Sequence, residues 1–183
     1  DDLSDGGANH YTEVVQAIKY AVPSVIVEVL TPDFNGSTDA VMSVIRSGAN
    51  VFSHNMETVE RLYPAIRPLA SYQRSLKILA FAAREAKISV KSGFMVGLGE
   101  TEEEVLQLMT DIRKTDCDFL TIGQYLKPKG LPLKVTEYIY PDTFEILKIK
   151  AFDIGFKNVA SGPYVRSSYR AGEMIHSTSS VSP

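Results

Sequence analysis

Helical and strand patterns of apolar and polar residues alternate along the chain. Apolar residues recur at helical spacing over residues 11–22, and a nearly continuous β-branched run follows at residues 25–30. Because that run is apolar at almost every position, we expect a strand covered on both faces. The pattern also predicts helices near residues 40–45, 72–86, 105–112 and 144–154, and strands near residues 51–53, 93–96, 119–126 and 158–161. This alternation predicts an α/β fold with a parallel sheet of about five strands.

The run at residues 91–100 joins a predicted strand to a predicted helix through a glycine elbow. Gly97 and Gly99 allow a tight turn and let the backbone approach a ligand without a Cβ in the way. Thr101 and Glu104 have the spacing of a capping box, which predicts that a helix begins there. A strand–helix connection that binds nothing would explain the same glycines, so the residues alone leave both interpretations open.

Polar residues gather after the short strand predicted at residues 51–53. His54, Asn55 and Glu57 follow it directly, and ligand sites of parallel sheets form at the carboxyl ends of the strands. The alternative is that Asn55 and Thr58 only begin the next helix.

Composition and charge argue against several classes of protein. A chain of 183 residues with 44% apolar content can bury one sizeable core, so we expect one domain or most of one. The net charge of −3 and the lack of a Lys/Arg block argue against a nucleic-acid partner. No apolar run is long enough for a membrane span, and the acidic N-terminus does not resemble a targeting segment. Cys117, the single cysteine, excludes a disulfide framework within this sequence, and we expect it to be buried.

Several motifs, in order along nearly the whole chain, resemble lipoyl synthases, a family of radical S-adenosylmethionine enzymes. They are Asp1–Leu3 with Asp5–Ala8, Val27–Leu30, His54–Val59, Lys91–Gly93 with Gly97–Glu100, Thr121–Leu126, Ser161–Pro163 and Val165–Tyr169. The resemblance implies a partial (β/α)6 radical S-adenosylmethionine barrel that is TIM-barrel-like, with parallel strands, outer helices and the first strands missing. We expect residues 1–174 to form this barrel and a C-terminal extension with an Arg-Ser-Ser-Tyr motif, and residues 175–183 to be a disordered tail.

The resemblance also implies a reaction, its cofactors and its partners. Lipoyl synthases are sulfurtransferases that insert two sulfur atoms at carbons 6 and 8 of a protein-bound octanoyl group. The implied cofactors are S-adenosyl-L-methionine and two 4Fe-4S clusters. The implied partners are an electron donor and the octanoylated lipoyl-carrier domain of a 2-oxoacid dehydrogenase or the glycine cleavage H protein. The implied location is the cytoplasm in a bacterium and the mitochondrion in a eukaryote.

The cysteine count departs from the family pattern. Lipoyl synthases carry two cysteine triads upstream of the Asp-Asp-Leu segment, and Cys117 matches neither. This chain alone therefore cannot assemble a thiolate-ligated cluster, and we expect it to be inactive by itself. A partial sequence is the simpler interpretation, and a cluster-less homologue or binding module is the alternative.

Site residues follow from the matching motifs. The resemblance implies that S-adenosylmethionine binding involves Asn55, Lys91, Gly93, Met95, Gly97, Glu100 and Gln124. It implies that Ser167 ligates the fourth iron of the auxiliary cluster, although a hydroxyl that caps local backbone is the competing interpretation. No catalytic residue is identified in this segment.

One alternative function stays open, and two structural expectations follow. An ordinary barrel enzyme that uses Glu28, His54 or Lys91 for acid–base chemistry stays open, and Glu28 itself is either an interior carboxylate or a residue at the barrel rim. If the first strands are missing, residues 25–30 form an exposed apolar edge. We then expect one mouth of the barrel to collect His54, Gly97, Tyr125 and Ser167.

Overall fold

Five parallel strands form one sheet in a computed structural model that describes residues 3–86, 88–130, 132–169 and 171–172. The strands are β1 (Glu28–Leu30), β2 (Val51–Ser53), β3 (Ser89–Val96), β4 (Phe119–Gln124) and β5 (Asn158–Gly162). They lie side by side in the order of the sequence, and each neighbouring pair is parallel. The predicted parallel α/β sheet is confirmed.

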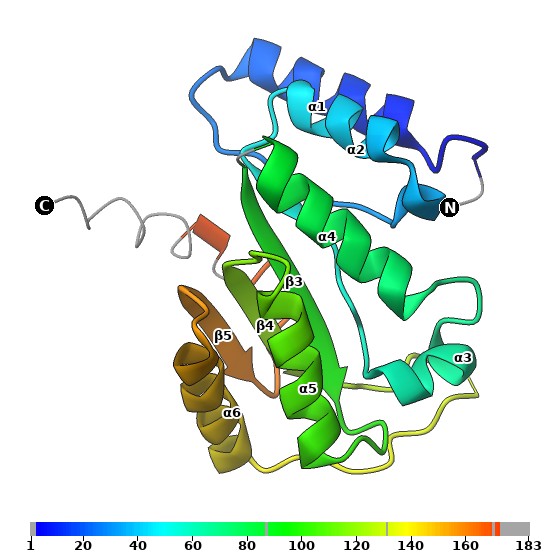
Figure 1. The fold of residues 1–183 in the computed structure, drawn as a ribbon, viewed down its shortest axis with the longest axis vertical. Helices are drawn as coiled ribbons and strands as arrows, with labels where there is room; N and C mark the ends of the chain where they lie inside the picture. Colours follow the sequence, from blue (N-terminus) through cyan, green and yellow to red (C-terminus); the bar gives the residue numbers. More distant parts are fainter. Residues whose placement is uncertain (1–2, 87, 131, 170, 173–183) are drawn as a thin grey trace, which may run out of the picture.

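The helices are α1 (Ala8–Ala21), α2 (Thr38–Arg46), α3 (Tyr63–Ile66), α4 (Tyr72–Ala86), α5 (Glu102–Arg113) and α6 (Pro141–Ile154), with 3-10 turns at Phe34–Gly36 and Glu60–Leu62. They connect consecutive strands, apart from α1, which precedes β1, and α4, α5 and α6 lie on one side of the sheet (Figure 1). α1 packs against α2 at one end of the molecule. In the described part of the chain, no helix is long and apolar enough to cross a bilayer.

The two faces of the sheet carry different residues. Side chains alternate along a strand, so Phe94 and Ile122 point toward the helices, whereas Gly93 and Thr121 point to the inner side. The outer face supplies much of the buried core, through Val29, Phe52, Val90, Phe94, Val96, Leu120, Ile122 and Val159. The inner side also carries Val51, Met95 and Phe119, but Gly93, Thr121 and Gly123 leave room there, and the candidate site lies beside them.

Helix α5 begins with a capping box that the local sequence encodes. The Thr101 hydroxyl accepts a hydrogen bond from the Glu104 backbone N–H at 3.3 Å, and the Glu104 carboxylate accepts one from the Thr101 N–H at 2.8 Å. The predicted capping box is confirmed, and it fixes the point at which the chain leaves the glycine elbow.

Two expectations about local structure are wrong. The run predicted as a covered strand forms a strand only at residues 28–30, at the edge of the sheet. Val25 and Ile26, just before it, and Leu30 in it are 36%, 42% and 42% exposed. The exposed apolar edge that the missing first strands would produce is thereby confirmed. Residues 60–62 form a 3-10 turn whose capping residue is Val59, and Asn55 and Thr58 therefore do not begin a helix. The predicted disordered tail, residues 175–183, lies outside the described residues.

Candidate functional site

The candidate site is a small hollow of about 90 Å3 on the inner side of the sheet. Four predicted site residues meet there: Asn55 after β2, Gly93 and Met95 on β3, and Ser167 in the C-terminal segment. The full lining is Asn55, Glu57, Gly93, Phe94, Met95, Thr121, Gly123, Val165, Arg166 and Ser167. The hollow therefore joins segments from the middle and the end of the chain.

Two glycines allow the walls of this hollow to approach each other. A Cβ on Gly93 would collide with the Thr121 hydroxyl and lie 3.1 Å from Asn55 Oδ1. A Cβ on Gly123 would collide with the backbone carbonyl of Val165. Any larger residue at either position would displace a wall of the hollow.

The side chain of Asn55 places an oxygen acceptor, unpaired within the described chain, inside the hollow. Asn55 Nδ2 donates a hydrogen bond to Glu57 Oε1 at 3.1 Å, which leaves Asn55 Oδ1 buried and without a partner among the described residues. Glu57 adopts a left-handed backbone conformation with φ 65°, which is unusual for this residue type. Its backbone N–H donates to the Gly93 carbonyl at 3.1 Å, and this contact keeps the turn beside β3. An unpartnered buried acceptor is costly, so this geometry favours a ligand that donates to it.

Ser167 faces the same hollow from the C-terminal segment. No hydrogen bond of its hydroxyl to the described residues is present, which disfavours the interpretation of Ser167 as a backbone cap. Beside it, Arg166 Nη1 donates to the Val165 carbonyl at 2.6 Å and places a positive charge at the rim. The hydroxyl is free within the described structure to bind a metal or ligand.

The hollow is not lined by Gly97, Glu100 or Gln124. Their hydrogen bonds instead fix backbone segments next to it. The Glu100 carboxylate accepts hydrogen bonds from the backbone N–H groups of Gly97 and Leu98, which fixes the glycine elbow. Gln124 donates to the Glu137 carbonyl at 3.0 Å and accepts from the backbone N–H of residue 139 at 2.9 Å. We call residues 126–130 and 132–140, which Gln124 contacts, the strap.

Lys91 is also outside the lining of the hollow. Its ammonium group, on β3, lies 3.0 Å from the Glu28 carboxylate on β1, and it reaches across β2 to do so. The side chains are 2% and 16% exposed, respectively. Glu28 is therefore an interior carboxylate. Because Glu28 and Lys91 form a salt bridge with each other, this geometry disfavours both as acid–base residues.

His54 does not converge on the hollow with Ser167, contrary to the prediction of a common mouth. Its buried ring lies 2.9 Å from the Thr31 carbonyl through Nδ1 and 2.9 Å from the Ser75 hydroxyl through Nε2. Burial, only partly opposed by the hydrogen bond to Thr31, lowers the pKa of His54 to about 4. A buried histidine with both nitrogens bonded lacks access to a substrate, and this disfavours the acid–base barrel enzyme.

Tyr125 does not join this group either, since its hydroxyl donates to the Leu133 carbonyl in the strap at 3.1 Å. Together with Gly97 and Gln124 it belongs to the support of the strap. The predicted convergence is therefore wrong for His54, Gly97 and Tyr125. Each of them hydrogen-bonds to backbone groups outside the hollow.

Cys117 behaves as the sequence predicts. It is fully buried, and burial raises the pKa of its thiol to about 12, so it stays protonated. Across the described ranges, no group of three or more His, Cys, Asp or Glu side chains could hold a metal ion. The assignment of Ser167 as a metal ligand stays a prediction.

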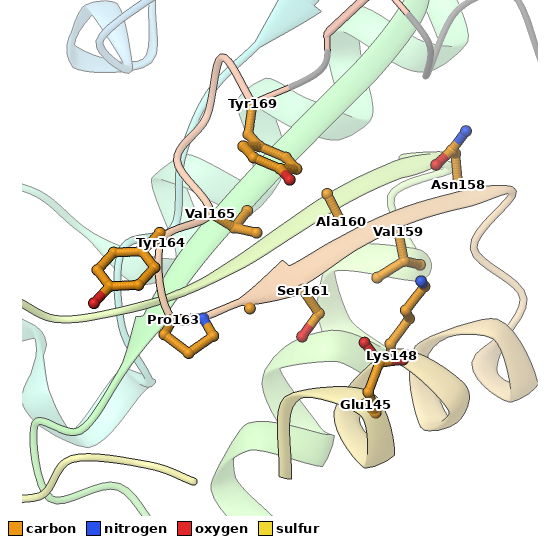
Figure 2. A pocket seen from close by; sticks show the side chains of 11 residues that line it. Glu145, Lys148, Asn158, Val159, Ala160, Ser161, Pro163, Tyr164, Val165 and Tyr169 are labelled. Carbon is orange, nitrogen blue, oxygen red and sulfur yellow. The ribbon is translucent and has the colours of Figure 1, made fainter. Parts of the chain in front are cut away.

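A larger cavity of about 580 Å3 lies along β5, between α6 and the C-terminal segment (Figure 2). Glu145 and Lys148 enter it from α6, and Tyr164, Val165 and Tyr169 enter it from the opposite side. It contains none of the predicted site residues, and it shares only Val165 with the hollow. We therefore place the candidate site at the smaller hollow.

Sequence reasoning missed Thr121, Gly123 and Val165 as parts of the site. The period of two along β4 carried a usable signal, because it puts Thr121 and Gly123 on the face opposite Leu120 and Ile122. Val165 had no such signal, since only the fold of the C-terminal segment brings it to Gly123.

Comparisons of the sequence with known proteins give one consistent result. Lipoyl synthase from Caldicellulosiruptor bescii is 52% identical over 172 residues, which are 93% of this chain and 59% of that protein. Lipoyl synthase from Dechloromonas aromatica is 48% identical over 97% of this chain and 57% of its own length. Chloroplastic lipoyl synthase from Ricinus communis is 50% identical over 97% of this chain and 50% of its own length. No protein-family model matches the chain.

Solved structures with similar folds agree with the architecture. Methylornithine synthase has a TM-score of 0.67 at 17% identity, over 89% of this chain and 57% of its own. A domain of pyruvate-formate lyase-activating enzyme from Bacteroides vulgatus has a TM-score of 0.62 at 11% identity, over 84% of this chain and 92% of its own. At such identities the likeness shows the fold alone, which is a five-stranded parallel sheet with helices that fits part of a barrel.

The chain thus spans between half and about three fifths of the length of these lipoyl synthases. With about half of its residues identical to theirs over more than nine tenths of its own length, the chain belongs to the lipoyl synthase family.

Proposed function

We propose that this chain is part of a lipoyl synthase, and that it supplies one wall of the S-adenosylmethionine site and one oxygen ligand of the auxiliary cluster. The observation that carries the proposal is the shared hollow, in which Asn55, Gly93, Met95 and Ser167 meet. The reaction is the insertion of sulfur into an octanoyl group on a carrier domain, with an external electron donor.

The residues present fit a nucleoside cofactor. Asn55 Oδ1 is a buried acceptor without a partner among the described residues, and a hydroxyl or amino group of the cofactor would donate to it. Met95 would supply apolar contact to the base, and Gly93 and Gly123 keep bulk out of the wall. Ligand cavities are usually roughly 300–1,000 Å3, so the cofactor would extend well beyond this hollow.

The same hollow fits the edge of an anionic cluster. A serine oxygen is a harder and weaker ligand for iron than a thiolate, so Ser167 can release its iron more readily than a cysteine would. Arg166 at the rim favours a negatively charged group by electrostatic attraction. The auxiliary cluster, when bound, supplies the sulfur atoms. We infer that the thiolate ligands come from the part of lipoyl synthase that this chain does not cover, and that this chain alone is inactive.

We propose the cytoplasm as the location in a bacterium and an organelle in a eukaryote. The relative from Ricinus communis carries the word chloroplastic in its name.

The ligand role of Ser167 is tested in a chain joined to both cysteine triads. Ser167→Ala should leave cleavage of S-adenosylmethionine largely intact but abolish formation of the lipoyl product, and it should change the electron paramagnetic resonance spectrum of the auxiliary cluster. Ser168→Ala is the matched control and should have a milder effect. Lipoyl product at the unmodified rate in Ser167→Ala would show that Ser167 is not a ligand.

The role of Asn55 is tested by binding rather than turnover. Asn55→Ala removes the acceptor and should weaken S-adenosylmethionine binding by about tenfold, as loss of one buried hydrogen bond does. Asn9→Ala, at an exposed position on α1, is the control and should bind normally. Equal affinity in both variants would remove Asn55 from the cofactor site.

A further inference from the structure

A second cavity, of about 360 Å3, lies outside the inner-face hollow. It is enclosed between the loop after β1, residues 32–35, and the turn that joins α3 to α4, residues 66–70. Gly6 and Arg74 complete the wall. Its lining combines a mainly apolar wall with two arginines, and the proposed function uses none of these residues.

The two guanidinium groups are held in place but keep unused donors. Arg74 Nε donates to Asp33 Oδ2 at 2.7 Å, and Nη2 donates to the Leu69 carbonyl at 3.0 Å. Arg67 Nη1 donates to the Asn55 carbonyl and the Tyr63 hydroxyl, both at 3.1 Å. An arginine has five N–H donors in a planar fork. Nε and Nη2 of Arg67 and Nη1 of Arg74 therefore remain without a partner among the described residues.

The charges around the cavity do not cancel. Asp33 is the one carboxylate in the lining, against two guanidinium groups. Both of its oxygens are occupied, since Oδ1 accepts from the Asn35 N–H at 3.0 Å and Oδ2 accepts from Arg74. Burial is the main cause that lowers the pKa of the neighbouring His54 ring; the positive charges of Arg67 and Arg74 lower it further, and Asp33 opposes them.

The loop that forms one wall is held in an unfavourable backbone conformation. Phe34 and Asn35 are consecutive non-glycine residues with φ values of 47° and 52°. A left-handed backbone is unfavourable for residues other than glycine, and such a conformation persists where the surroundings enforce it. Here the enforcing contacts are those of Asp33 with Asn35 and Arg74. The salt bridge thus shapes the cavity as well as placing Arg74 in it.

We propose that this cavity binds a carboxylate carried on a short apolar chain, with Arg67 and Arg74 as its partners. A guanidinium fork matches the two oxygens of a carboxylate, and the pairing is charge-assisted. Pro32, Phe34 and Leu69 offer apolar surface to the chain that carries it. Because Arg67 also holds the Asn55 carbonyl, an occupied cavity would be coupled to the wall of the hollow.

The test uses butyrate as a free carboxylate and the peptide acetyl-Gly-Glu-Gly-amide as an acidic side chain, both at constant ionic strength. Nuclear magnetic resonance follows the side-chain Nε–H signals of Arg67 and Arg74. We expect saturable shifts that are confined to these signals and to backbone amides around the cavity. Tighter binding of the peptide would identify an acidic protein side chain as the source, and tighter binding of butyrate a free small carboxylate.

Variants separate this site from general charge effects. Arg67→Gln should weaken binding by about tenfold or more, because a charge-assisted pair is lost. Arg84→Gln, which removes an arginine on the far part of α4, is the matched control and should bind normally. Leu69→Glu guards against misfolding of Arg67→Gln, because Leu69 is 90% exposed and a glutamate there would compete for the arginines. Unchanged binding in both Arg67→Gln and Leu69→Glu, or equal shifts with chloride, would overturn the proposal.

Discussion

At the scale of single residues, the surroundings of a glycine decide what it does. Gly97 and Gly130 both have left-handed backbones, with φ values of 97° and 88°. A Cβ on Gly97 would collide with the Gln124 side chain and the Glu137 carbonyl, whereas nothing lies within 4 Å of a Cβ on Gly130. Gly97 is therefore required by the strap as well as by the turn.

Gly97→Ala should lower the free energy of unfolding by about 3 kcal/mol or more, from backbone strain and the collision together. Gly130→Ala should cost about 1 kcal/mol, because only the backbone strain applies. Urea unfolding of both variants checks this. Equal losses in the two would show that the strap is not anchored at Gly97.

His54 should make stability depend on pH. Its pKa is about 4 in the folded protein, against about 6.5 in an unfolded chain, so the unfolded chain binds the extra proton between these values. The contribution is fully present above pH of about 6.5, falls as the pH is lowered, and levels off below about 4, with a total of up to about 3 kcal/mol. Urea unfolding at several pH values measures it.

His10→Gln, at an exposed position, is the control for this pH dependence and should leave the profile unchanged. His54→Gln should be less stable at pH 7 and should lack the step. A profile for His54→Gln that still falls between pH 6.5 and 4 by the same amount would show that another group causes it.

At the scale of elements, the buried ion pair links β1 to β3 across the strand between them. Glu28→Gln leaves the fully buried Lys91 ammonium unpaired and should cost about 3–5 kcal/mol of stability. Lys91→Met should cost less, because the remaining Glu28 carboxylate is 16% exposed to water. The double variant should be more stable than the sum of the two losses predicts, as a double-mutant cycle measures.

The exposed pair Arg84–Asp116 is the reference for that cycle. Its side chains are 59% and 60% exposed, and the coupling there should be at most about 1 kcal/mol. A coupling between Glu28 and Lys91 that is no larger than this would mean that the interior pair does not join the strands.

At the scale of the whole molecule, one side of the chain exposes apolar surface. Val14 and Ile18 on α1 and Val22 at its C-cap are 42%, 39% and 51% exposed, and β1 adds its uncovered edge. An edge strand with apolar side chains presents unpaired backbone groups and attracts other chains. We expect the chain, when expressed alone, to self-associate through this side.

Ile26→Lys places a charge on that edge and should reduce self-association, as light scattering over a concentration series measures. Ile149→Lys is the matched control, since Ile149 is 59% exposed on α6, and it should leave the self-association unchanged. A monodisperse unmodified chain would contradict this prediction.

The sequence alone determined the elements, their order and the family. Helices and strands follow from periods of 3.6 and 2, and the capping box of Thr101 and Glu104 satisfies backbone groups only three residues apart. These signals are readable because their physical causes lie within a few residues. The motif matches likewise brought forward Asn55, Gly93, Met95 and Ser167, which meet in the hollow.

Only the tertiary structure decided which polar residues face that hollow. His54 and Asn55 are neighbours in the sequence, yet His54 is bound by Thr31 and Ser75, while Asn55 Oδ1 is left open. For Gln124 and Gly97 the cofactor role stays a prediction, and the fold adds that both contact the strap. The partners of each side chain come from segments far apart along the chain, and strand register and close packing select among them.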